Sequence, residues 1–435
     1  MTVLGLILAA AGGGSSGFGG GGGGGFSGGG GGGGFSGGRG GSGVYIGGGA
    51  ISGWFVLAAV LAFLAFFLFA IVSTWLTVRR MRRRLDDRDR QVRTAAAEAA
   101  DDDAFFEPDR VTQDVTIMFH AIQGAWDARD EHALASLVGN DLMVEWHRRL
   151  DDFERKGWHN RVRVIAGPDV RYVGMTNRER DEEDRVVVHV SASLEDYVEA
   201  GGGMRVMQTG DSDSVTNLRE FWTLTKREGR WILTSIEQDA EGGHQLDAPL
   251  VTSPWADERL RDESLVEGAV AEAALPGVAT AELVSVSLAG DARAQALDLS
   301  LADARFAPDV LAAAARRAAE AWADAVDGDD APLAAIATAD ALDALLYGGD
   351  HSHDSRLVVR GPRIDGVAIE ELQTAPEPAR MTLAVSVRGR RYVEDRDTAA
   401  VLSGSKEREA TFTERWTMAL DGTDDTPWRL VGVAA

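Results

Sequence analysis

A long apolar stretch near the N-terminus constrains this chain more than any other feature. Residues 51–78 carry no charged side chain, and an arginine collar follows at once, made of Arg79, Arg80, Arg82, Arg83 and Arg84. A helix of about 20 apolar residues crosses the hydrocarbon core of a bilayer. Trp54 and Trp75 stand near the two ends, where indoles favour the headgroup level. The sequence therefore predicts a transmembrane helix, with a core helix of a soluble protein as the alternative.

The charges around this stretch predict its orientation. Only Arg39 is basic before residue 51, whereas the collar lies directly after residue 78. Basic flanks stay on the cytoplasmic side of a membrane. We therefore expect a single-pass protein of the cell (inner) membrane, with its N-terminus outside and its C-terminal domains in the cytoplasm. The collar is expected to bind anionic lipid headgroups.

The segments around the apolar stretch are low in complexity. Residues 1–11 are an apolar run similar to the core of a signal peptide, but without its basic start. Residues 12–50 are rich in glycine, which predicts a flexible tail; its spaced aromatic residues leave weak self-association open. Over residues 79–104 we expect the collar followed by a helical stalk. The stalk should be exposed to solvent, because residues 85–100 show no apolar stripe.

Composition limits the function classes. The chain has 435 residues, and its apolar fraction of 45% is sufficient for two or three domains with buried cores. It has no cysteine, which excludes disulfides and thiolate metal sites. The net charge of −24 argues against nucleic acid as a partner, because phosphate backbones repel an acidic surface.

An internal repeat organises the rest of the chain. An amphipathic helix ending near Trp126 is matched about 195 positions later by one ending near Trp322, and Gly167-Pro168 recurs as Gly361-Pro362. The motifs around Trp222 and Trp231 recur around Trp416 and Trp428 in the same order. The repeat predicts a first domain over residues 105–246, a linker over 247–279 and a second domain over 280–435. Gly290-Asp291 is interpreted as a hairpin turn of the second domain.

Each copy places helices before strands, which predicts an α+β fold. We expect two cone-like (NTF2/cystatin-like) units in which helices pack on a curved antiparallel sheet. Paired aromatic residues are expected to fill or line the cone, and they define a candidate pocket for a ligand or partner: Phe119, Trp126, Glu220, Trp222, Trp231, Trp322, Glu414 and Trp416.

The first copy, including MFHAIQGAWDARDEHALASLVGNDLM and the later REFWTL and GRWIL, resembles the Tim44-like domain family. That family is typified by the mitochondrial presequence-translocase scaffold and includes bacterial membrane proteins. The resemblance covers about residues 109–239 and extends more weakly to 306–433. It implies a non-enzymatic scaffold or tether that binds a protein partner or polypeptide segment near the bilayer, in protein translocation or membrane organisation. The alternative is a pocket for a lipid or other apolar small molecule, with isomerase or hydrolase chemistry.

Two groups of polar residues could carry chemistry. His351 and His353, with Asp354, have the spacing of a metal clamp, but the surrounding glycine-rich loop favours a solvated segment without a metal. Glu220 and Glu414 each stand two residues before a tryptophan and so face the same side of a strand. Aromatic walls would raise the pKa of such a carboxyl, whereas an ion pair with Arg219 or Arg415 is the simpler interpretation. We expect no catalytic residue and no cofactor.

Overall fold

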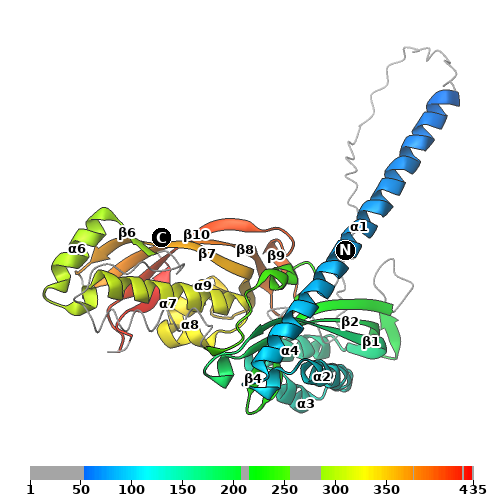
Figure 1. Cartoon of the computed structure of the whole chain (residues 1–435), viewed down its shortest axis with the longest axis horizontal. Helices are drawn as coiled ribbons and strands as arrows, with labels where there is room; N and C mark the ends of the chain where they lie inside the picture. Colours follow the sequence, from blue (N-terminus) through cyan, green and yellow to red (C-terminus); the bar gives the residue numbers. More distant parts are fainter. Residues whose placement is uncertain (1–52, 207–214, 255–285, 376, 424–425, 434–435) are drawn as a thin grey trace. The chain divides into compact units, whose positions relative to one another are not determined.

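The computed structural model describes residues 53–206, 215–254, 286–375, 377–423 and 426–433 (Figure 1). The described residues belong to two compact units, which divide between Asp87 and Arg88. The signal-like segment 1–11, the glycine-rich tail 12–50 and most of the predicted linker lie outside the described residues.

The helix α1 (Gly53–Ala99) contributes to both units. Its first part exposes large apolar side chains with exposed fractions between 39% and 71%: Leu61, Phe63, Leu64, Phe66, Phe67, Leu68, Phe69, Val72 and Leu76. In the described portion of the chain, no helix combines the length and apolar content that a membrane crossing requires, so the structure does not support the span predicted over residues 51–78.

The first repeated domain follows α1 and places three helices before an antiparallel sheet. The strand order is β1-β2-β4-β5, with β3 paired to the outer part of β2. Its elements are η1 (Ala104–Phe106), α2 (Pro108–Ala128), α3 (Glu131–Leu137), α4 (Asn140–Arg155), β1 (His159–Thr176), η2 (Asp181–Glu183), β2 (Arg185–Ala200), β3 (Met204–Val206), β4 (Val215–Arg227), β5 (Arg230–Gln238) and η3 (Gly242–Asp247).

The second repeated domain has the same order of helices followed by strands, with the short strand β6 added before its helices. Its sheet runs β11-β10-β8-β7-β6, with β9 paired to β8, and only β6 is parallel to its neighbour. Its elements are β6 (Val286–Leu288), α6 (Gly290–Ser300), η5 (Ala304–Phe306), α7 (Pro308–Asp327), α8 (Ala331–Ile336), α9 (Ala339–Tyr347), β7 (Ser355–Gln373), β8 (Arg380–Asp395), β9 (Val401–Gly404), β10 (Ala410–Ala419) and β11 (Arg429–Val433).

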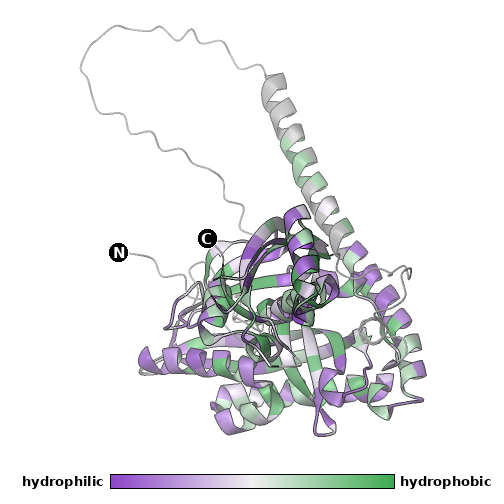
Figure 2. Cartoon of the chain, turned by 90° about the vertical axis from the view of Figure 1, so that its left-hand side faces the viewer, coloured by the Kyte–Doolittle hydropathy of each residue, from purple (hydrophilic) through white to green (hydrophobic). Residues whose placement is uncertain are grey.

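The two domains repeat one local arrangement closely at the entry to their first long helix. Asp103 caps η1 and Asp303 caps η5, each by accepting a hydrogen bond from the backbone two residues on. Trp231 donates its indole N–H to the carbonyl of Phe105 (3.1 Å), and Trp428 donates to that of Arg305 (3.0 Å). An α+β fold with a duplicated core is therefore confirmed, and amphipathic helices cover both sheets (Figure 2).

The pairing of Trp126 with Trp322 in the sequence repeat is wrong. The helices α2 and α7 begin at Pro108 and Pro308, which are 308 − 108 = 200 positions apart. Trp126 packs on Trp146 of α4, with ring centroids 5.5 Å apart, whereas Trp322 packs on Trp416 of the sheet at 5.4 Å. The repeat spacing shrinks further along because α9 has 9 residues where α4 has 16.

The solvated stalk predicted before residue 104 is also wrong in its second part. Val92, Ala96 and Ala99 are at most 1% exposed and belong to the core of the first domain. The Arg88 guanidinium donates to the carbonyl of Val173 (2.8 Å) in β1. Small side chains at helical spacing suffice to dock a helix closely, although they give a weak hydrophobic pattern in the sequence.

Two smaller expectations change as well. Gly290 and Asp291 begin the helix α6 rather than a hairpin turn, with Ala292 and Ala296 buried. The start of the predicted linker belongs to the first domain, because the backbone of Asn177 donates to Val251 (2.8 Å). Residues 255–285, which include the rest of that linker, lie outside the described residues.

Candidate functional site

The candidate residues of the first domain form a packed core rather than a cavity wall. Phe119 and Trp222 have ring centroids 5.5 Å apart, and both are fully buried. Trp231 packs edge-on against Phe106 at 5.5 Å. Trp126 lies at the other end of α2 against Trp146. The structure brings Phe119, Trp222 and Glu220 together and places Trp126 and Trp231 in separate contacts.

The glutamate of the first domain does not form the ion pair expected for it. Glu220 is 2% exposed and accepts hydrogen bonds from the Trp222 indole (2.9 Å) and the Gln238 amide (2.8 Å). Arg219 pairs instead with Asp239 (3.3 Å). Burial raises the pKa of Glu220 to about 7, partly offset by these two donors. The structure therefore favours the interpretation of a carboxyl with a raised pKa.

The corresponding residues of the second domain behave differently. Trp322 and Trp416 are fully buried, but Glu414 pairs with the guanidinium of Arg391 (3.4 Å). Among the described residues, the indole N–H of Trp416 has no hydrogen-bond partner. Arg415, named above as a partner for Glu414, pairs with Glu370 (3.1 Å). Only this second glutamate keeps the expected salt bridge, and with a different arginine.

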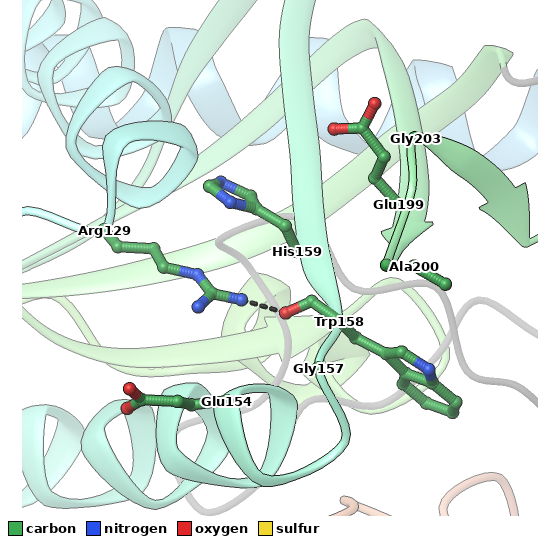
Figure 3. A pocket seen from close by; sticks show the side chains of 9 residues that line it. Arg129, Glu154, Gly157, Trp158, His159, Glu199, Ala200 and Gly203 are labelled. Carbon is green, nitrogen blue, oxygen red and sulfur yellow. Dashed lines mark hydrogen bonds between the residues drawn. The ribbon is translucent and has the colours of Figure 1, made fainter.

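A cavity of about 480 Å³ lies at the rim of the first domain, away from these aromatic residues (Figure 3). Three segments form it: the turn after α2, the end of α4 with the start of β1, and the turn between β2 and β3. The lining residues are Arg129, Glu154, Gly157, Trp158, His159, Glu199, Ala200, Gly201 and Gly203. The cavity is open, and it combines an aromatic ring with both signs of charge.

A buried chain of hydrogen bonds supports the cavity from beneath. The Trp126 indole donates to the side-chain oxygen of Asn160 (2.8 Å). The amide of Asn160 donates in turn to the carboxylate of Asp196 (2.7 Å) and to the carbonyl of Tyr197 (3.2 Å). This chain joins α2, β1 and β2. Trp126 thus contributes to the site by fixing its supporting elements.

The end of α2 positions the charged wall. Arg129 adopts a left-handed conformation (φ 55°) that ends the helix, and its guanidinium donates to the carbonyl of Trp158. The carboxylate of Asp127 accepts from the backbone N–H of Val162 (2.9 Å), and its carbonyl lies 2.8 Å from Nε2 of His159. These bonds hold the start of β1 against the turn, so the cavity is preformed.

The histidine loop does not form a metal clamp. His351 and His353 each contact a different oxygen of Asp343 in α9, at 2.8 and 2.7 Å. Asp354 instead pairs with Arg148 of the first domain (2.8 Å). Both imidazoles are therefore engaged by the Asp343 carboxylate. The arginines of the collar, Arg79, Arg80, Arg82, Arg83 and Arg84, are exposed.

The two domains contact one another through buried charges that the sequence did not reveal. Glu145 of α4 and Arg396 of the turn after β8 form an ion pair at 2.6 Å, and they are 3% and 7% exposed. Arg148 and Arg155 of α4 pair with Asp397 at 2.9 and 3.0 Å. The second domain thereby fixes α4, whose last turn carries the cavity residue Glu154.

Comparison with known proteins identifies the first domain. Residues 92–238 match the family model of the Tim44-like domain. This part of the chain is therefore a Tim44-like domain, and it begins within α1, where Val92 enters the core. The resemblance noted in the sequence is confirmed for the first copy. No curated protein matches the chain.

Two solved structures show only remote likeness. The intermembrane space region of the chloroplast protein ARC6 is 9% identical, with a TM-score of 0.23, over 28% of this chain and 92% of that one. An Ntf2-like protein involved in plasmid conjugation is 9% identical, with a TM-score of 0.17, over 71% of this chain and 87% of that one. Neither likeness carries an argument about this protein.

Sequence reasoning did not identify the cavity residues Arg129, Glu154, Trp158, His159 and Glu199. The available signals were a glycine before Trp158 and the run Gly201 to Gly203. Both mark tight turns at the ends of elements, where binding residues concentrate.

Proposed function

We propose that the chain is a membrane-anchored scaffold whose Tim44-like domain binds a polypeptide segment of a partner protein in the rim cavity. The proposal rests chiefly on one observation: a preformed cavity with an aromatic ring and both signs of charge lies on a domain of the Tim44-like family. The family's association with protein translocation gives the expected context, and the partner is expected near the bilayer.

The apolar surface of α1 supports the anchoring part of the proposal. Its exposed phenylalanines and leucines lie between residues 61 and 76, directly before the exposed arginine collar. Large apolar patches on a water-exposed surface are rare, and they mark contact with a membrane or a partner. We propose that this part of α1 inserts in the cell membrane, that the collar binds anionic headgroups, and that the repeated domains face the cytoplasm.

The composition of the cavity supports a polypeptide rather than an apolar small molecule. Arg129, Glu154 and Glu199 offer charged contacts, and Trp158 offers an aromatic anchor. Aromatic and arginine side chains dominate the energetics of protein interfaces. An apolar ligand would fit better in the domain interior, but Phe119 and Trp222 fill that space and Glu220 is enclosed beside them.

Photocrosslinking in cells tests the partner site. A photoreactive phenylalanine analogue at position 154 or 199 should capture the same specific protein, since both positions line the cavity. Position 165 is the control, because Ile165 is 48% exposed on β1 and lies outside the cavity. Capture of the same set of abundant proteins from all three positions would contradict the proposal.

Charge insertion tests the anchor. The double variant Leu64→Arg, Leu68→Arg places two arginines in the apolar part of α1, each unfavourable by about 2.5–3.5 kcal/mol at a bilayer centre. The variant should lose its resistance to alkaline extraction from membranes. Glu98→Arg is the control, since it places an arginine at an exposed, already charged position of the same helix. Equal retention of the wild type, the double variant and the control in the membrane fraction would exclude insertion of α1.

Reporter fusions test the orientation. A fluorescent protein fused to the C-terminus should be fluorescent, and alkaline phosphatase fused there should be inactive, because the domains are proposed to face the cytoplasm. The reverse pattern would place them outside.

A further inference from the structure

Three potential metal ligands from both repeated domains meet where the domains contact one another. They are Glu237 of β5 and His244 of η3 in the first domain, and Asp327 at the end of α7 in the second. One ligand atom of each lies within 4.8 Å of the others. A second acidic group, Asp103 with Asp181 and Asp184, differs because the ammonium of Lys226 already lies among its carboxylates, 2.5 Å from Asp103 and 2.8 Å from Asp181.

One oxygen of Glu237 points into the group without a donor. Glu237 is 1% exposed, and its Oε2 accepts a hydrogen bond from the Gln245 amide (2.8 Å). Its Oε1 is buried and accepts no hydrogen bond from any described residue; Nε of Arg360 lies 4.0 Å away. A buried carboxylate oxygen without a donor is unfavourable, and a cation bound beside it would remove that cost.

His244 presents a lone pair to that oxygen. Its Nδ1 lies 3.1 Å from the carbonyl of Glu241, which can only accept, so Nδ1 carries the proton. In the neutral ring, Nε2 is then an acceptor, and it lies 3.6 Å from Oε1 of Glu237. Two acceptors facing each other at this distance are stabilised by a cation between them. A histidine that donates its other nitrogen to a carbonyl is the usual arrangement of a metal ligand.

The second domain is shaped around this imidazole. Gly361 has φ 58°, and a Cβ placed there would lie 2.6 Å from Cγ of His244. Only glycine combines that conformation with so close an approach. The ring orientation is therefore set by packing between the domains, independently of the acidic residues.

The buried charges around the group do not balance. Four carboxylates, Glu237, Glu241, Asp327 and Glu394, contact two cations, Arg360 and Lys406. The formal sum is −4 + 2 = −2 when His244 is neutral. Burial raises the pKa of Glu394 to about 8, so this carboxyl is largely protonated at neutral pH and the sum is then closer to −1. A divalent cation would offset this excess of negative charge.

We propose that a divalent metal ion, best fitted by Zn²⁺, binds between the domains to Glu237, His244 and Asp327. Two carboxylate oxygens and one imidazole nitrogen match the ligand preferences of zinc, with water in the fourth position. Magnesium and calcium prefer six or more oxygen ligands, which this group does not provide. Because its ligands come from both domains, the ion links them and stabilises their contact.

Zinc binding by the full-length protein in detergent tests the proposal. After treatment with a chelator, the protein should take up one Zn²⁺ per chain, and its melting temperature should rise. His244→Gln should weaken the affinity for Zn²⁺ by at least about 100-fold, beyond the 10–100-fold expected from losing an outer partner. The same variant should show no melting shift with chelator.

His351→Gln is the matched control, because His351 is a surface histidine of the loop that grips Asp343. This variant should keep both the uptake and the melting shift. Circular dichroism checks that both variants fold. Absence of uptake by the folded wild-type protein, or loss of uptake in His351→Gln with retention in His244→Gln, would overturn the proposal.

Discussion

The two repeated domains share one frame but differ at the glutamate before their central tryptophan. Glu220 is enclosed with Trp222 and Gln238, whereas Glu414 reaches Arg391 and leaves the Trp416 indole unpaired. The first domain keeps a long α4 and a rim cavity, and the second has the short α9 and holds α4 of the first. The two units thus share a core but differ in their polar residues: the first carries the rim cavity, and the second is a supporting domain that holds α4 of the first.

The largest effect on stability is expected where the contact between the two repeated domains is broken. Arg396→Met leaves Glu145 buried without its cation, which should lower the free energy of unfolding by about 3–5 kcal/mol. Chemical denaturation of the full chain measures it. Arg388→Met is the control, because Arg388 pairs with Asp365 at the surface (2.9 Å). Equal effects of the two variants would show that the buried contact does not hold the domains together.

The next effect is the pH dependence that Glu220 contributes in the first domain, beside that of Glu394 in the second domain, whose pKa is about 8. The pKa of Glu220 is about 7 in the folded protein and about 4.3 when unfolded, so folding favours its protonated form. Its contribution is full below pH 4.3 and is lost as pH rises towards 7, by roughly 3 kcal/mol. Glu220→Gln should reduce the slope of stability against pH by this amount and stabilise the protein at pH 8 relative to wild type, while the contribution of Glu394 remains. Denaturation between pH 4.5 and 8 measures the free energy of unfolding. If its dependence on pH were the same in Glu220→Gln and wild type, this prediction would be refuted.

A matched pair of tryptophan variants compares the two cores directly. Trp222→Phe removes the donor to a buried carboxyl and should cost about 1–3 kcal/mol beyond the change in packing. Trp416→Phe removes an N–H that has no partner, so only the packing change remains. Denaturation of both variants measures the difference. A larger loss of stability in Trp416→Phe than in Trp222→Phe would contradict the hydrogen bond assigned between Trp222 and Glu220.

The smallest effect is expected at the glutamate of the second domain. Glu414→Gln weakens a partly exposed ion pair with Arg391 and should change stability by less than about 1 kcal/mol. It should also leave the pH dependence unchanged. A slope loss as large as that of Glu220→Gln would show that the two glutamates are equivalent after all.

Local patterns were sufficient for much of the fold. Apolar spacing predicted α2 and α7, and the placement of helices before strands in each copy predicted the α+β class. The docking of Val92, Ala96 and Ala99 was missed because alanines at helical spacing give little contrast with a solvated helix. The exposed apolar residues of α1 were evident in the sequence, and their membrane role remains a proposal.

The sequence by itself determined the duplication, the order of helices and strands, and the Tim44-like character of the first copy, because these depend on residues close together in the chain. Tertiary structure alone decided which glutamate is buried, which turns meet to form the cavity, and which charges face each other between the domains. Glu237 and Asp327 are 90 positions apart, and Glu145 and Arg396 are 251 apart. Burial and pKa depend on neighbours brought together by the fold, and no local pattern encodes them.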